Sequence, residues 1–209
     1  MKIEALLFDM DGTVIKSLEL WDEITASFVG KQNIERFNEL RNQSAKKGLA
    51  RDCEVFQSVF NLKKTDAEIE QMYHQKAREF FAKAPIDFVE GFVDFHQHLV
   101  CQNMKISLVT DAPNYGLNVL KDHLNLPFFF GQHIYNSCIM DFTFKPDPKI
   151  LFHALEKLEV NPENCVIFED STEGITAEKK QTYAALQLIM APMRIKLTRP
   201  MLLLTITKI

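Results

Sequence analysis

Residues 6–13 read LLFDMDGT, an apolar run that ends in two acidic residues and a glycine. We expect residues 3–9 to form a buried strand that delivers Asp9 and Asp11 to the rim of an active site. Gly12 permits the chain to turn directly after this strand. A carboxylate at a strand end suits a nucleophile or a ligand of a hard cation, and a second one past the turn can serve as acid and base.

A calcium-binding loop that begins Asp-x-Asp is the alternative interpretation of this segment. Such a loop requires Gly at its sixth position and Glu at its twelfth. Those positions hold Val14 and Leu20, so we set the calcium interpretation aside.

Length, composition and charge limit the classes of protein. The chain has 209 residues, 46% hydrophobic and 25% charged, which suits a globular protein with one large core and a smaller second unit. A net charge of −4 without a basic stripe predicts no nucleic-acid partner. No apolar run reaches a membrane span and no signal peptide precedes the first strand, so we expect no membrane association, a cytoplasmic location and a monomer. The four cysteines lack paired spacing, which predicts free, mostly buried thiols.

The periodicity of the chain indicates two structural units. Between residues 17 and 85, amphipathic helical patterns replace strand-like runs, and the Thr65-x-x-Glu68 spacing predicts a capping box at the start of a helix that Pro85 ends. After Pro85, strands and helices alternate. The expected helices are 92–101, 114–125 and 147–158, and the expected strands are 105–110, 133–136 and 165–169.

This alternation predicts an α/β fold. The core is expected to be a Rossmann-like doubly wound parallel sheet made by residues 1–16 and 86–209, with its site at the carboxyl edge of the sheet. Residues 17–85 are expected to form an inserted, all-helical cap domain.

Polar residues at the expected strand ends form a set that suits phosphoryl transfer. The set comprises the carboxylates of Asp9, Asp11, Glu169 and Asp170, the hydroxyl of Thr110 and the ammonium of Lys145. Clustered carboxylates repel one another unless a cation lies among them, and Mg²⁺ favours oxygen ligands of this kind. A metal ion, a lysine and a hydroxyl together can hold the oxygens of a phosphoryl group.

Four segments, in this order, resemble the motifs of the haloacid dehalogenase superfamily. They are DMDGT at 9–13, LVTD at 108–111, KPDP at 145–148 and FEDS at 168–171. The resemblance implies that Asp9 is a nucleophile that forms an aspartyl-phosphate, and that Asp11 protonates the leaving group and then activates water. It also implies that Thr110 and Lys145 hold the phosphoryl oxygens.

The same resemblance implies a set of ligands for Mg²⁺. The side chains of Asp9 and Asp170 and the backbone carbonyl of Asp11 would bind the ion, and Glu169 would assist directly or through water. An acid at the position of Asp11 is typical of the phosphatases and phosphomutases of the superfamily, so dehalogenation is disfavoured.

The helical insert resembles the cap of the beta-phosphoglucomutase-like branch. Its KGLAR segment resembles the substrate-specificity loop of that branch, which implies that Lys47, Gly48 and Arg51 contact the non-reacting part of the substrate. Lys76 and Arg78 are further candidates for such contacts.

Trp21 is another candidate for substrate contact, and it stands where the mutase has a histidine that positions the acid. The loss of that imidazole favours discharge of the phospho-enzyme by water. We therefore predict a Mg²⁺-dependent phosphatase that acts on a small phosphate monoester, with a sugar phosphate as the expected class. A sugar phosphomutase and a catalytically weak phosphate-binding or regulatory protein remain alternatives.

The chain departs from the pattern of the superfamily after its fourth motif. From about Ala177 the expected Ala-Gly turn and buried strand are absent, and residues 181–209 are basic and apolar. Reading the codons from about Ala177 one base earlier permits family-like sequence, so we hypothesise a frameshift in the gene or in its record. If the tail is genuine, one strand of the sheet is expected to be missing. An intact mass that matches the printed sequence would exclude an error in the record.

Overall fold

The structure, a computed structural model, describes residues 3–44, 46, 48–81, 83, 86–140, 143–170 and 187–190. The described strands form one parallel sheet in the order β3-β2-β1-β4-β5. They are β1 (Ala5–Phe8), β2 (Lys105–Thr110), β3 (Ile134–Asn136), β4 (Cys165–Glu169) and β5 (Gln187–Met190). The strand β1 lies at the centre, where Leu7 is opposite Ser107 of β2 and Ile167 of β4. The segment that follows β1 therefore leaves the middle of the sheet at its carboxyl edge.

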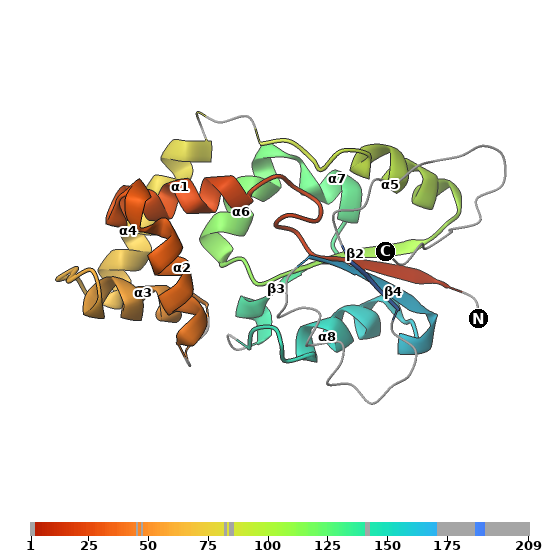
Figure 1. Cartoon of the computed structure of the whole chain (residues 1–209). Coiled ribbons are helices and arrows are strands. Elements are labelled where there is room, and N and C mark those ends of the chain that lie inside the picture. The colour runs from red at the N-terminus through yellow and green to blue at the C-terminus, as the bar shows by residue number, and fades with distance from the viewer. Residues whose placement is uncertain are drawn as a thin grey trace.

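Helices cover both faces of this sheet (Figure 1). On one face lie α5 (Phe92–Cys101), α6 (Asn114–His123) and α7 (Leu126–Phe130), and on the other lies α8 (Lys149–Leu158). Alternation along β1 explains both layers, because Leu6 and Phe8 join the core on the first face while Ala5 and Leu7 join the core against α8. The prediction of a doubly wound α/β core is confirmed.

Four helices between β1 and α5 form a group beside the sheet, which we call the helical cap (Figure 1). They are α1 (Leu18–Val29), α2 (Ile34–Gln43), α3 (Gly48–Ser58) and α4 (Asp66–Phe81), with a short 3-10 turn at Lys31–Asn33. Their apolar faces meet around Phe37, Phe56 and Tyr73, whose rings pack against one another in pairs.

The capping box at the start of α4 forms as predicted. The backbone N–H of Glu68 donates to Oγ1 of Thr65, and the backbone N–H of Thr65 donates to the carboxylate of Glu68 at 2.8 Å. The two residues thus satisfy backbone donors that the first turn of a helix leaves without partners.

Two features differ from the expected elements. The helix expected over 114–125 ends at His123, and the short helix α7 follows, because Asn125 adopts a left-handed φ of 50° and Pro127 is tolerated in a first helical turn. The fifth strand, β5, pairs with β4, although a strand was expected to be missing. Outside the described residues lie Lys47, Pro85 and, after Asp170, every residue other than those of β5, Ala177 included.

All four cysteines are free, as predicted, but only two of them are buried, since Cys101 is exposed and Cys138 is partly exposed. Cys53 and Cys165 are buried, and burial raises the pKa of each thiol to about 12. Neither thiol is therefore ionised near neutral pH. Among the helices that the structure describes, none is both long enough and apolar enough to cross a bilayer.

Candidate active site

The chain after β1 folds into a tight loop around Gly12. The loop closes because the N–H groups of Val14 and Ile15 both donate to the carbonyl of Met10, at 2.9 and 3.0 Å. Gly12 has a φ of 84°, and a Cβ at this position would lie 2.2 Å from Oδ2 of Asp170. Glycine is therefore needed both for the backbone of the loop and for its close approach to Asp170.

A cluster of carboxylates lies at the carboxyl edge of the sheet. Asp9, Glu169 and Asp170 bring carboxylate oxygens within 4.8 Å of one another, because β1 and the neighbouring β4 end side by side. Burial raises the pKa of Asp9, and Glu169 and Asp11 add to this rise. Burial and Glu169 also raise the pKa of Asp170. These oxygen ligands fit a hard divalent cation such as Mg²⁺, whose charge would relieve their repulsion.

Lys145 lies between two of these carboxylates. Its Nζ donates to Oδ1 of Asp9 at 2.6 Å and to Oε2 of Glu169 at 2.7 Å, and 4% of its side chain is exposed. Burial acts to lower the pKa of Lys145, but Asp9 and Glu169 raise it above its usual value, so the ammonium group stays charged. Its backbone N–H donates to both carboxylate oxygens of Asp111 at 3.2 Å, which ties the loop that carries the lysine to the end of β2.

The side chain of Asp11 points to different partners. Its Oδ1 accepts hydrogen bonds from Oγ of Ser17 at 2.5 Å and from Nε1 of Trp21 at 2.6 Å. Burial raises the pKa of Asp11, and the two hydrogen bonds act in the opposite direction. Because an indole N–H can only donate, it keeps Oδ1 as an acceptor and directs any proton on Asp11 to Oδ2. Such a carboxyl group is suited to proton transfer.

Thr110 ends β2 on the same edge of the sheet and is buried. Its Oγ1 accepts the N–H of Ala112 at 3.0 Å, so the hydroxyl stabilises the turn after the strand. Asn136, at the end of β3, donates to the carbonyl of Ala112 and to Oδ1 of Asn114. The loop after β2 is thereby held against the site.

A cavity of about 840 Å³ lies between this edge and the helical cap. The predicted catalytic residues Asp9, Asp11, Thr110 and Lys145 line it from the core, together with Asp170. The structure thus brings these five residues to one space.

The predicted substrate contacts divide into three groups. Trp21, Gly48 and Arg51 line the cavity from the helical cap. Lys76 does not, and its Nζ instead pairs with Glu79 on the same helix at 3.0 Å. Arg78 is likewise absent from the described lining, and Lys47 lies outside the described residues.

Further cavity residues were missed in the sequence. Asn38, Arg41 and Asn42 line the cavity from one face of α2, and Asp52 lines it from α3. Nε of Arg41 lies 2.7 Å from Oδ1 of Asp52, and Nε of Arg51 lies 3.8 Å from the same oxygen. Burial raises the pKa of Asp52, while Arg41 and Arg51 act to lower it. The signal that could have found this face is the i, i+3, i+4 spacing of polar residues on α2.

At two glycines, an aromatic ring packs closely across the boundary between the helical cap and the core. A Cβ on Gly48 of the cap would lie 2.3 Å from the ring of Phe144 in the core. A Cβ on Gly116 of α6 would lie 2.8 Å from the ring of Trp21 in the cap. Each part therefore rests an aromatic ring on a glycine of the other part.

The fold and the site together define an α/β protein with a buried carboxylate cluster at the carboxyl edge of its parallel sheet, and comparison with known proteins places it in a family. The family described as haloacid dehalogenase-like hydrolase matches residues 3–180. The chain therefore belongs to the haloacid dehalogenase-like hydrolases. The match ends three residues beyond Ala177, where the sequence leaves the expected pattern.

Individual relatives are similar over most of the chain. A 6-phosphogluconate phosphatase of Escherichia coli (strain K12) is 25% identical over 181 residues, which cover 83% of this chain and 76% of the relative. A beta-phosphoglucomutase of Bacillus subtilis (strain 168) is 27% identical over 190 residues, which cover 85% and 79%. The crystal structure of CbbY from Rhodobacter sphaeroides in complex with phosphate has a TM-score of 0.75 at 24% identity and covers 91% of this chain and 86% of that chain.

Proposed function

We propose that the protein is a Mg²⁺-dependent phosphatase that hydrolyses a small sugar phosphate through an aspartyl-phosphate intermediate. The observation that carries this proposal is the buried Asp9, which is paired with Lys145 and lies beside Glu169 and Asp170 at the core end of the cavity. The name of the Escherichia coli relative, a 6-phosphogluconate phosphatase, supports the substrate class.

The proposed reaction uses Asp9 and Asp11 in two steps. A carboxylate oxygen of Asp9 attacks the phosphorus atom as the bond to the ester oxygen breaks, and Asp11 gives its Oδ2 proton to the departing oxygen. A water molecule then gives a proton to Asp11 and attacks the phosphoryl group, which releases inorganic phosphate and regenerates Asp9. Lys145 and Thr110 hold the phosphoryl oxygens in both steps.

Mg²⁺ would supply charge neutralisation on these oxygens. The residues that would hold it are Asp9 and Asp170 through their carboxylates, Asp11 through its backbone carbonyl, and Glu169 directly or through water. The clustering of three of these carboxylates supports the assignment.

We also propose that residues 17–85 act as a movable cap over a core of residues 1–16 and 86–209. Closure would exclude bulk water during the first step and would select the substrate through contacts of Gly48 and Arg51. The enzyme is proposed to work as a cytoplasmic monomer without nucleic-acid or membrane partners, in keeping with its net charge of −4.

A sugar phosphomutase is the second candidate, and the similarity to a beta-phosphoglucomutase favours it. The missing imidazole argues against it less than the sequence suggested, because Trp21 donates its own N–H to Asp11. The two activities differ in their product: a phosphatase releases inorganic phosphate, whereas a mutase moves phosphate within the sugar.

The test measures inorganic phosphate released from hexose, pentose and short-chain phosphates, with Mg²⁺ or with a chelator. Wild type is expected to release phosphate only with Mg²⁺, and Asp9→Asn is expected to lose activity by roughly 10³-fold or more because an amide is a poor nucleophile. Asp94→Asn, which removes an exposed carboxylate on α5, is the matched control and should keep the wild-type rate.

Other outcomes would contradict the proposal. Transfer of phosphate within a sugar, without net release, would identify a mutase. Binding of the esters without turnover would identify a binding or regulatory protein. Equal rates in wild type and Asp9→Asn would exclude Asp9 as the nucleophile.

A further inference from the structure

The two ends of the cavity differ in charge. At the reacting end, the ammonium group of Lys145 and a divalent cation would attract the phosphoryl group. At the cap end, the charged residues that the structure describes in the lining are four carboxylates and two guanidinium groups: Asp22, Asp52, Asp66 and Glu70 against Arg41 and Arg51. The described cap lining therefore carries a net negative charge.

The positive charge at the cap end is offset locally. Asp52 is 9% exposed, and its Oδ1 lies 2.7 Å from Nε of Arg41 and 3.8 Å from Nε of Arg51. A buried carboxylate this close to both guanidinium groups weakens the field that either could exert on a substrate anion. The three remaining carboxylates of the described lining belong to exposed residues of α1 and α4: Asp22, Asp66 and Glu70. That of Asp66 accepts a hydrogen bond from Nε2 of Gln57 at 2.7 Å.

The uncharged groups at this end are suited to hydroxyl groups. Asn38 and Asn42 present side-chain amides, which both donate and accept hydrogen bonds. The hydroxyl groups of Thr25 and Tyr73, both in the cavity wall, form a hydrogen bond of 2.6 Å with each other. Carboxylates, amides and hydroxyls together match the alternating donors and acceptors of a polyol.

We propose that the enzyme selects phosphate esters whose non-reacting part is an uncharged polyol, and discriminates against esters that carry a second phosphate or a carboxylate at that end. This inference rests on the proposed phosphatase function and specifies its substrate class. A second anion would meet like charges along the described lining, whereas hydroxyl groups would find partners among its amides and hydroxyls. The preferred class thus differs from the carboxylated ester named for the Escherichia coli relative.

Two pairs of substrates that differ in one group test the proposal. Glucitol 6-phosphate is compared with 6-phosphogluconate, and glycerol 3-phosphate with 3-phosphoglycerate, since each pair exchanges a terminal CH₂OH group for a carboxylate. The neutral member is expected to have a kcat/KM about tenfold or more above that of its partner. In the double variant Asp22→Asn with Glu70→Gln, this ratio should fall by about threefold or more, because part of the repulsion is removed.

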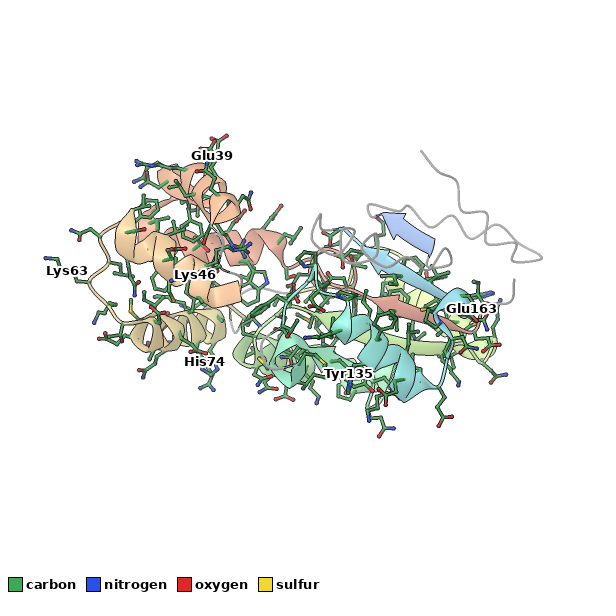
Figure 2. All side chains as sticks on the ribbon, turned by 90° about the horizontal axis from the view of Figure 1, so that it is seen from below. Glu39, Lys46, Lys63, His74, Tyr135 and Glu163 are labelled. Carbon is green, nitrogen blue, oxygen red and sulfur yellow. The ribbon has the colours of Figure 1, made fainter. Side chains whose placement is uncertain are left out.

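The matched control is Glu39→Gln. Glu39 is an exposed carboxylate on α2 that does not line the cavity and is labelled on the outer side of the helical cap in Figure 2. This variant removes one negative charge from the cap, against two in the double variant, and should leave the ratio unchanged. An equal fall of the ratio in Glu39→Gln would overturn the proposal, because it would trace the selectivity to overall charge.

Binding separates this proposal from the phosphatase function. In Asp9→Asn with Mg²⁺, calorimetry should show the neutral ester of each pair bound more tightly than its carboxylated partner. If wild type releases no phosphate but this preference remains, the phosphatase function fails and the selectivity stands. Equal or tighter binding of 6-phosphogluconate and 3-phosphoglycerate, or binding of neither member of a pair, would overturn the proposal.

Discussion

The effect of a side chain at Gly12 can be tested against a control glycine, Gly91, in the same protein. Gly12 and Gly91 have φ values of 84° and 83°, but a Cβ would meet Asp170 only at Gly12, since nothing lies within 4 Å of the corresponding position at Gly91. Both Gly→Ala variants should lose roughly 1–3 kcal/mol of unfolding free energy through backbone strain. Gly12→Ala alone should also weaken Mg²⁺ binding, by about tenfold or more, because it displaces Asp170, a proposed ligand of the ion.

Urea unfolding and calorimetric titration with Mg²⁺ measure the two effects separately. The same Mg²⁺ affinity in both variants would show that the contact with Asp170 does not support the metal site.

Trp21 should affect the rate more than substrate binding. Trp21→Phe removes the N–H that holds Oδ1 of Asp11 and keeps an aromatic ring over Gly116. We expect kcat to fall by roughly tenfold, with a smaller change in KM, because the proton-transferring group loses its orientation. Trp21→His, which retains a ring N–H, should recover part of the loss in steady-state assays. Full activity of Trp21→Phe would assign the indole N–H a purely structural part.

The grouping of the proposed catalytic and metal-binding residues at one edge of the sheet was predictable because each belongs to a short local motif. Asp9, Asp11, Lys145 and Glu169 stand next to strands or turns that the sequence pattern locates. Their partners were harder to predict. The contact of Trp21 with Asp11 spans a loop and the first helix of the cap, and its formation depends on how that helix packs.

The capping box of α4 makes a prediction at the scale of one element. The backbone and side-chain hydrogen bonds from Thr65 lower the pKa of Glu68 in the folded protein, so this stabilisation is present above the usual value of 4.5 and is lost as the pH falls through the lowered value. Thr65→Ala should cost about 1 kcal/mol of unfolding free energy near neutral pH. The cost should shrink at low pH, where Glu68 is protonated.

Chemical unfolding at both pH values measures this cost. Ser58→Ala is the control, because it removes an exposed side-chain bond to the carbonyl of Glu54 without involving an ionisable group. A cost of Thr65→Ala that does not change with pH would exclude the proposed coupling to Glu68.

The bounds of helices and strands were predicted correctly where the apolar periodicity and the residues that end an element agree. The helix at 92–101 and the strands at 105–110 and 165–169 form with the predicted bounds. The helix predicted over 114–125 was too long, because its apolar spacing continues smoothly into α7 while Asn125 turns the backbone between them. The spacing of apolar side chains cannot reveal that one residue between two helices has a left-handed backbone conformation.

At the scale of the molecule, the metal site should couple stability to pH. The raised pKa values of Asp9 and Asp170 mean that ionising them costs stability, so the unfolding free energy of the metal-free protein should fall as the pH rises above their usual value of 3.8. The proposed Mg²⁺ ion would offset the repulsion between these carboxylates, and at about 100 times its Kd it should raise the Tm by about 5 °C near pH 8.

The same addition of Mg²⁺ should raise the Tm less near pH 5, because protonated carboxylates bind the ion weakly. Thermal denaturation with and without Mg²⁺ checks both values. Asp170→Asn should lose most of the increase, and an increase in wild type that is independent of pH would argue against these carboxylates as the ligands.

The cavity itself could not be predicted in full because two distant parts of the chain form it. The face of α2 that carries Asn38 and Arg41 has the composition of an ordinary solvent-exposed helix, and only packing of the helical cap turns it toward the core. The pairing of Arg41 with Asp52 also joins neighbouring helices, which spacing along one helix cannot reveal.

The packing of Trp21 on Gly116 has an optical consequence. Trp21 is the only tryptophan of the 209 residues, and its ring lies where the helical cap meets the core, with its N–H on the carboxylate of Asp11. Light near the red edge of protein absorbance therefore excites a single indole, which lies at the boundary between the helical cap and the core. Its emission wavelength and intensity should change if cap and core separate, so the proposed closure of the cap can be followed during turnover in the unlabelled protein.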